Sequence, residues 1–334
     1  MLSKPLGRIV AGLIVVIIIM VAWFALQVDP LFHGKGKNVI VAVSNGESLS
    51  ALANAIHAKG VIASTLAFQI DTTLFGSFQV SAGSYEIAQG SSFSHVRSVF
   101  SAPPNVVTVD VTAGLTLREV AFNVADGKGN SYGDRFAQLA TADQTLSPFH
   151  SSGSLEGLIG TGEYIIRPGE SPAKLATTME KRFVKQADSV GLTPSTTLNG
   201  LNAYQLVIAA SIVEKEGYYP VNMPKVARVI YNRLARGGPL QMDATVLYYL
   251  GKDGGTVTPA MLQTQEPYNT YLNTGLTPTP ICTVSTIAMR ATLHPPAGSW
   301  LYFTLINEDG TMAFSTTFAQ QLHEENVAQQ NGIG

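Results

Sequence analysis

Residues 202–217 read NAYQLVIAASIVEKEG, and this stretch decides how the C-terminal half of the chain folds. Its apolar residues Leu206, Ala210 and Val213 recur at helical spacing, which predicts a helix that packs into a core. Gly217 follows directly and is the expected stop of that helix. The C-terminal half should therefore contain a helix with one buried apolar face at this position.

The same helix ends in Glu-Lys-Glu, so that two carboxyl groups lie close to one helix end. Glu214 follows Ala210 by four residues and borders the buried stripe, about 200° around the helix from Glu216. A carboxyl group against apolar surface is well placed to act as a general acid. From spacing alone, a solvated helix end is the simpler explanation. Glu216 is expected to make a structural salt bridge or hydrogen bond.

The segments that follow extend a mainly helical domain. Residues 223–235 predict a second amphipathic helix, and residues 285–293 predict a third. Two strands are expected at residues 300–305 and 312–315, on either side of an Asn-Glu-Asp-Gly turn. The predicted fold class of residues 155–334 is thus mainly helical with a small β part.

Four segments of the preceding region repeat one pattern, in which a short strand is followed by a Gly turn, a Ser or Thr, and a helix. The strands are expected at Val39–Val43, Tyr85–Ala88, Val109–Val111 and Tyr164–Ile166. Glycine permits the left-handed backbone of such a turn, and the hydroxyl group caps the free N–H groups of the helix. A phosphate site is not expected, because neither phosphate-binding glycine motif occurs. Residues 38–150 are therefore predicted to form an α+β region.

Residues 9–28 form a transmembrane candidate, since 18 of these 20 residues are apolar and none is charged. A helix of that length spans about 30 Å, which is the thickness of the hydrocarbon core. The alternative is a secretory signal peptide, whose apolar region is shorter and precedes a small-x-small cleavage site that is missing here. Basic residues lie on both sides, so the positive-inside signal is weak. The simplest arrangement is a cytoplasmic tail of residues 1–8, one span, and a large exported domain.

The composition excludes several functional classes. The net charge is −2, with 46% hydrophobic and 13% charged residues, so neither a disordered chain nor a phosphate-contacting nucleic-acid binder is expected. The single cysteine, Cys282, cannot form an internal disulfide and is interpreted as a small buried hydrophobe. The six histidines form no ligand pair, and no G-x-S-x-G elbow occurs. We therefore expect no metal, no cofactor and no α/β-hydrolase site.

Two clusters rich in Tyr, Asn and Gln follow the Glu-Lys-Glu helix. Aromatic faces can stack on sugar rings, and amides can bind hydroxyl and acetamido groups. The candidate carbohydrate-binding residues are Gln241, Asp243, Tyr268, Asn269 and Tyr271. Turn packing and helix capping are the alternative roles of these residues.

Five short motifs occur in an order that resembles the YceG-like family, the MltG-type endolytic murein transglycosylases. They are Leu155-Glu156-Gly157, Ala210–Glu216, Tyr231–Leu234, Leu240–Val246, and Tyr268–Tyr271 with Gly275–Pro278. The resemblance covers almost the whole chain, and a LysM-like module after an N-terminal anchor also fits it. The sequence departs from the family pattern after Gly157, at Ala244, at Cys282-Thr283-Val284 and at Ala313.

The resemblance implies a bacterial inner-membrane enzyme that cuts nascent peptidoglycan glycan strands internally, outside the cytoplasm, and so ends their elongation. Its catalytic glutamate corresponds to Glu214. That residue would protonate the oxygen between N-acetylmuramic acid and N-acetylglucosamine, and then act as base toward the muramyl 6-hydroxyl to form a 1,6-anhydro end. Because no water attacks, a second carboxylate is not required. Glu156 either lines the substrate cleft or supports the domain junction.

Other functions stay open at this stage. The chain could be a non-catalytic peptidoglycan-binding protein, a hydrolytic muramidase, or a structural partner of the wall-synthesis enzymes. The intact motif around Glu214 favours the transglycosylase. Peptidoglycan strands, the cytoplasmic membrane and wall-synthesis enzymes are the partners that the resemblance implies.

Overall fold

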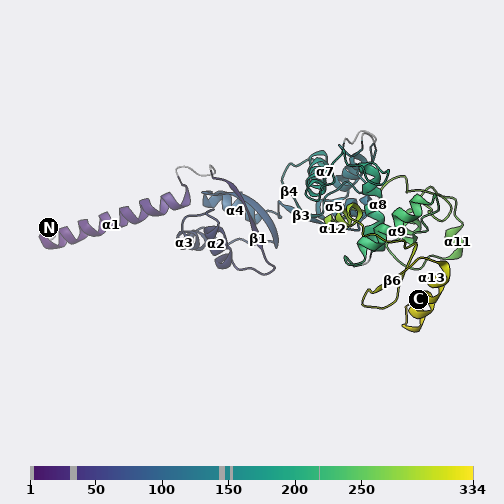
Figure 1. Cartoon of the computed structure of the whole chain (residues 1–334). Coiled ribbons are helices and arrows are strands. Elements are labelled where there is room, and N and C mark those ends of the chain that lie inside the picture. Colours follow the sequence, from purple (N-terminus) through teal and green to yellow (C-terminus); the bar gives the residue numbers. More distant parts are fainter. Residues whose placement is uncertain (1–3, 31–35, 143–146, 151–152, 218, 334) are drawn as a thin grey trace. The chain divides into compact units, whose positions relative to one another are not determined.

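A computed structural model of the chain describes residues 4–30, 36–142, 147–150, 153–217 and 219–333. Its contacts divide the chain into two compact units (Figure 1). The first unit contains residues 1–108 and 165–169, and the second contains residues 109–164 and 170–334. Helices and strands occur in both units, so the mixed fold class predicted from the sequence is confirmed. Part of the predicted cytoplasmic tail, residues 1–3, lies outside the described residues.

The first unit joins a long helix to a small α+β module. The helix is α1 (Lys4–Val28), and the module consists of β1 (Asn38–Val43), α2 (Leu49–Ala58), α3 (Thr65–Leu74), β2 (Gly83–Ala88) and α4 (Phe93–Ser101). Strands β1 and β2 pair antiparallel, with Asn38 opposite Ala88 and Val43 opposite Gly83. Alternate strand residues join the helices in an apolar core, in which Phe68 meets Phe93 edge-on at 5.2 Å. The LysM-like character of this module stays a prediction.

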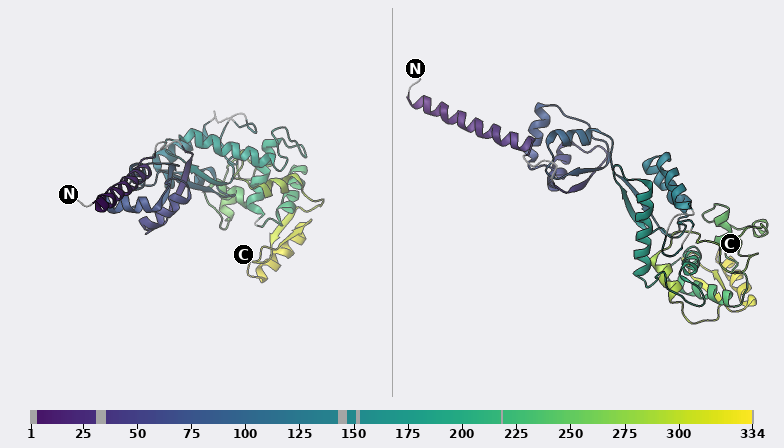
Figure 2. Two further views of the ribbon diagram at one scale, coloured as in Figure 1. Left: turned by 90° about the vertical axis from the view of Figure 1, so that its left-hand side faces the viewer. Right: turned by 90° about the horizontal axis from the view of Figure 1, so that it is seen from above.

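Helix α1 contains the one candidate membrane span of the described residues, Ile9–Val28. Most of its apolar side chains are exposed. Only its last turns pack on the core of the module, through the partly buried Phe24 and Val28. Both views in Figure 2 show α1 as one unbroken helix that meets the module at its C-terminal end.

The four repeated helix starts are confirmed. Helices α2, α4, α5 (Leu117–Lys128) and α7 (Pro172–Asp188) each begin after a Ser or Thr whose side chain accepts a backbone N–H of the first turn. The glycine of each preceding turn has a positive φ, between 69° and 88°. Each start is thus determined by a few local residues, as the sequence pattern predicted.

The division between the units differs from the predicted boundary at residues 150–155. It passes through a two-stranded sheet of β3 (Val107–Val111) and β4 (Gly162–Ile166). Residues 109–150 therefore belong to the second unit, because α5 and α6 (Asn130–Thr141) pack on each other and α6 packs on α7. The sequence assigned these residues to the first region because their strand–turn–helix pattern resembles that of the first unit.

The second unit is built around α8 (Ala203–Glu216). Its other helices are α9 (Met223–Ala235), α10 (Asp243–Tyr249), α11 (Pro259–Leu262), α12 (Thr286–Leu293) and α13 (Phe318–Gln330). Helices α9, α10 and α12 all pack on α8. Every residue from Leu206 to Val213 is buried, so that α8 is apolar all around, as expected of a helix enclosed by others. A short antiparallel hairpin, β5 (Tyr302–Leu305) and β6 (Met312–Ser315), packs against α13.

Candidate functional site

The C-terminal end of α8 presents three consecutive polar side chains to three different segments. Because successive residues are about 100° apart around a helix, Glu214, Lys215 and Glu216 each face a different neighbour. Their partners belong to the start of α12, the loop before α5 and the start of α10. This helix end is the candidate functional site.

Glu214 is half-buried, and its Oε2 accepts a hydrogen bond of 2.9 Å from the backbone N–H of Ser285. Ser285 is the N-cap residue of α12. The other carboxyl oxygen of Glu214, Oε1, has no hydrogen-bond partner in the described part of the chain. One oxygen is thus fixed by the backbone, and the other can meet a ligand.

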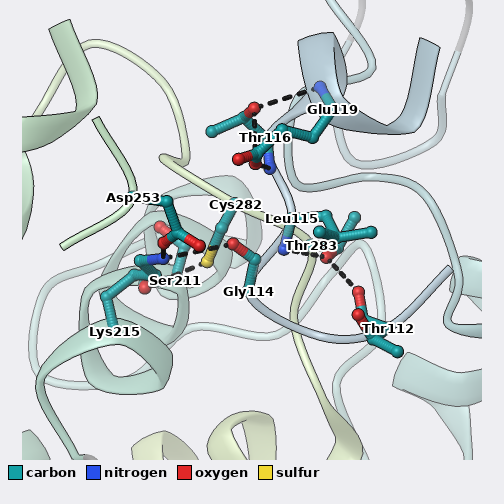
Figure 3. Close-up of polar contacts among 10 residues, drawn as sticks. All are labelled: Thr112, Gly114, Leu115, Thr116, Glu119, Ser211, Lys215, Asp253, Cys282 and Thr283. Carbon is teal, nitrogen blue, oxygen red and sulfur yellow. Dashed lines mark hydrogen bonds and ion pairs between the residues drawn. The ribbon is translucent and has the colours of Figure 1, made fainter. Parts of the chain in front are cut away.

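Lys215 connects the helix end to two loops. Its Nζ lies 3.3 Å from the carbonyl oxygen of Gly114 and 2.5 Å from a carboxyl oxygen of Asp253 (Figure 3). Burial works against the charged ammonium, but the hydrogen bond and charge of Asp253, with the charge of Glu119, raise the pKa of Lys215 above its usual value. The positive charge of Lys215 is thus matched by Asp253.

Glu216 holds the start of α10, since its Oε1 accepts a hydrogen bond of 3.0 Å from the backbone N–H of Ala244. Burial of the carboxyl raises the pKa of Glu216 to about 7, helped by the nearby charge of Asp243 and opposed by Arg233. The structural hydrogen bond expected for Glu216 is confirmed.

Gln241 and Asp243 lie beside this group and are exposed. Gln241 has a φ of 52°, and its N–H donates to the carbonyl oxygen of Thr270 at 2.9 Å. The carboxylate of Asp243 accepts a 2.6 Å hydrogen bond from the hydroxyl of Tyr271. A pocket of about 130 Å³ adjoins them, lined by Arg233, Arg236, Gly238, Pro239, Gln241, Leu301 and Tyr302.

The other two residues of the predicted tyrosine cluster, Tyr268 and Asn269, have different surroundings from Tyr271. Asn269 is 0% exposed, and its amide donates to the carbonyl oxygens of Leu262 and Thr264 and accepts from the N–H of Tyr271. All of these bonds join residues between the end of α11 and Tyr271, so the structure favours turn packing over substrate binding for Asn269. Tyr268 is half-buried, with its hydroxyl 2.8 Å from that of Thr279.

Glu156 is only 6% exposed and therefore does not line an open surface. Its carboxyl accepts the N–H of Leu117, at the start of α5, and the hydroxyl of Tyr248 in α10, all within 3.1 Å. Burial raises the pKa of Glu156 to about 7, against the lowering effect of these hydrogen bonds. These contacts join α5 to α10 inside the second unit, whereas the sequence offered a cleft-lining role or a role at the domain junction for Glu156.

Residues 281–285 run beside α8, and sequence reasoning missed their role. Ser211 in α8 accepts the N–H of Ile281 on its hydroxyl and the thiol of Cys282 on its carbonyl oxygen. Thr283 exchanges backbone hydrogen bonds with Gly114 and Leu115. Its hydroxyl also accepts the N–H of Leu115 and donates to the carbonyl oxygen of Thr112 (Figure 3). The one sign of this contact in the sequence was Ser211, a polar residue on an otherwise apolar helix. Cys282 is fully buried, as expected of a small hydrophobe, and burial raises the pKa of its thiol.

The predicted residues thus form separate groups. The structure joins Glu216, Asp243 and Tyr271 around the start of α10, and joins Glu156 to Tyr268 through Tyr248, whose ring lies 4.9 Å from that of Tyr268. Glu214 faces the start of α12 instead. Among the described residues, no three His, Cys, Asp or Glu side chains come together as metal ligands.

Comparisons with known proteins place the chain among characterised relatives. A model of the YceG-like family matches residues 41–329. An endolytic murein transglycosylase of Bacillus subtilis is 30% identical over 323 residues, covering 91% of this chain and 88% of that protein. The endolytic murein transglycosylase of Streptococcus pneumoniae R6 is 24% identical, covering 90% of this chain and 60% of that protein. The crystal structure of a YceG-like protein from Listeria monocytogenes has a TM-score of 0.58 at 24% identity, over 86% of this chain and 99% of that one, and shows the shared fold.

Proposed function

Because the chain belongs to the YceG-like family, we propose that it is an endolytic murein transglycosylase, which cuts peptidoglycan glycan strands internally. The observation that carries the proposal is the carboxyl group of Glu214. It stands at the end of a buried helix, with one oxygen held by the backbone of Ser285 and the other available. A rigid helix and a fixed oxygen give a proton-transferring group the constant position that it needs.

Glu214 would act twice in one turnover. As an acid it donates its proton to the glycosidic oxygen between N-acetylmuramic acid and N-acetylglucosamine, so that the bond to the muramyl C1 breaks. As a base it then takes the proton of the muramyl 6-hydroxyl, whose oxygen bonds to C1 and closes a 1,6-anhydro ring. The carboxyl returns to its first state without water. Such acid–base help is worth about 10²–10⁴-fold in rate.

The proposed substrate-binding residues near the start of α10 are the exposed Gln241 and Asp243 and the half-buried Tyr271. Gln241 offers an amide, Asp243 a carboxylate, and Tyr271 an aromatic ring whose hydroxyl is held by Asp243. Tyr268 is a further candidate, with part of its ring accessible. Asn269 and Glu156 would support these residues from below, because both are buried.

The proposed location is the bacterial cytoplasmic membrane, with the catalytic domain on the extracytoplasmic side. The support is α1, whose span Ile9–Val28 is long and apolar enough to cross the bilayer once. The short segment before the span would lie in the cytoplasm. At such a site the enzyme would meet newly made glycan strands, so wall-synthesis enzymes are the proposed protein partners.

The test compares the wild-type chain with the Glu214→Gln variant on purified glycan strands, with products identified by mass spectrometry. Glutamine keeps an oxygen that can accept the Ser285 N–H but has no acidic proton. We expect 1,6-anhydro-muramyl ends from the wild type and a loss of at least about 10²-fold in their rate of release by the variant. The matched control is Glu163→Gln, because Glu163 is exposed and lies in β4, away from α8.

Three outcomes would contradict the proposal. Equal release by wild type and variant would remove Glu214 from the reaction. Products heavier by one water would identify a hydrolytic muramidase. Strand binding without any cleavage would identify a non-catalytic peptidoglycan-binding protein.

A further inference from the structure

Helix α3 of the first unit exposes a line of large apolar side chains. Leu66, Ile70, Leu74 and Phe75 are between 37% and 69% exposed, and we name them the α3 stripe. The first three are four residues apart, which places them on one face of the helix. The opposite face, with Ala67 and Phe68, is buried in the core of the module. The helix is thus apolar on both its buried and its exposed faces.

The exposed face of α3 carries no charge. The only charged residue of this helix is Asp71, which is buried and forms a 2.7 Å ion pair with Arg97 of α4. The remaining exposed residues of the helix, Gln69 and Thr73, are neutral. A face exposed to water alone would usually carry several charged residues. An uncharged apolar face of this kind fits a surface that is itself apolar.

The place where α3 contacts α1 indicates which apolar surface the exposed face of α3 meets. Helix α1 packs on α3 and α4 through its last turns, at Phe24 and Val28. These residues belong to the 20-residue span Ile9–Val28. A helix of that length is about 30 Å long and needs all of its residues to cross the hydrocarbon core. The end of the span that contacts α3 therefore lies at the boundary between the lipid chains and the head groups.

We propose that the α3 stripe lies in the outer interface of the membrane that α1 crosses, so that the module rests directly on lipid. Interfacial helices bury an apolar face about 5–10 Å into the boundary between head groups and acyl chains. The α3 stripe offers such a face, on a helix that packs directly on the last turns of the span. This inference rests on the proposed membrane anchor and is independent of the proposed catalytic reaction.

The test measures how close the stripe comes to lipid, in the full chain reconstituted into phosphatidylcholine vesicles. Trp23 lies in the span and Trp300 in the second unit, and the chain has no other tryptophan. A Trp23→Phe background leaves Trp300 alone, and Phe75→Trp adds a probe on the stripe. The vesicles are made with and without phosphatidylcholine brominated near the head-group end of its acyl chains, since bromine quenches tryptophan on contact.

We expect Phe75→Trp to add emission that the brominated lipid quenches, while the emission of the background protein is unchanged. The matched control is Asn54→Trp, at an exposed position of α2 in the same module, whose added emission should persist. Adding Leu66→Ser and Leu74→Ser to the Phe75→Trp protein should reduce the quenching. Both residues are exposed, so circular dichroism should show an unchanged fold.

The wild-type chain separates the two ways in which the inference can fail. If Trp23 is quenched but the probe at position 75 is not, the anchor stands and the inference is overturned. If Trp23 is not quenched either, the anchor itself is wrong and the inference falls with it. A probe at position 75 that shifts to the blue without quenching would show that protein, such as a second copy of this chain, covers the stripe.

Discussion

At the scale of single residues, two carboxyl groups near the candidate site should contribute to the pH response of the second unit. Glu156 and Glu216 each accept hydrogen bonds from a helix start, and burial raises both of their pKa values to about 7. Both groups therefore carry a proton over much of the acidic range. Neither is the proposed catalytic group, so their protonation should change the stability of the structure around Glu214.

Glu156→Gln should weaken the pH dependence of stability. Because folding raises the pKa of Glu156 from 4.5 to about 7, its favourable contribution is complete below pH 4.5 and is lost as pH rises toward 7. The loss is on the order of 3 kcal/mol. Glutamine keeps an acceptor for Leu117 and Tyr248 and does not titrate. The free energy of unfolding in urea, measured across this pH range, should have a smaller slope in the variant.

The exposed Glu163 supplies the control for this measurement, since Glu163→Gln should leave the slope as it is in the wild type. An equal slope for Glu156→Gln and the wild type would show that burial does not govern this carboxyl group.

Asn269→Ala should destabilise the chain through its loop. The substitution removes an amide that joins two carbonyl oxygens and one N–H group. Each lost hydrogen bond should cost about 1 kcal/mol, visible as a lower midpoint of urea unfolding. If Asn269 bound substrate instead, the variant would keep its stability and show a raised KM.

At the scale of elements, local chemistry made the helix starts predictable from the sequence. A capping Ser or Thr and a left-handed Gly act within a few residues, so each start could be located by inspection. The burial of α8 on every side could not, because it depends on α9, α10 and α12, which come from later parts of the chain. The same reason explains why the sequence could not identify the partners of Glu156 and Thr283.

Thr116→Ala tests how much the cap at the start of α5 contributes to stability. Thr116 and Glu119 form a complete capping box at the first turn of α5. Losing the hydroxyl should cost about 1 kcal/mol and speed hydrogen exchange of the Glu119 amide, which donates to it. Thr116→Ser keeps the hydroxyl and should exchange at the wild-type rate. Equal exchange rates in the Ala and Ser variants would show that the cap contributes nothing.

At the scale of the whole molecule, the chain combines an apolar helix, an α+β module and a mainly helical unit that contains the proposed site. The predicted division into an anchor, a LysM-like region and a catalytic domain stays a prediction. The contacts group residues 109–150 with the second unit, partly through hydrogen bonds between residues more than a hundred positions apart, which no local pattern reveals.

The whole chain should behave as an integral membrane protein. Alkaline carbonate should leave it in the membrane fraction, and detergent should release it. Ile17→Lys with Ile18→Lys places two charges in the span, each costing about 3 kcal/mol near the bilayer centre. This double variant should appear in the carbonate supernatant, whereas Ile17→Val with Ile18→Val should not. A shortened wild-type chain in the soluble fraction would indicate a cleaved signal peptide instead.

The three consecutive contacts of Glu214, Lys215 and Glu216 have a consequence for how the chain can change in evolution. One residue inserted into α8 before Glu214 would turn all three side chains by about 100° and exchange their partners. Every one of the three neighbouring segments would then face the wrong side chain at once. Insertions and deletions in the last turn of α8 should therefore abolish function, even if a single substitution at Lys215 does not. A library of one-residue insertions along the gene should show a gap at this turn.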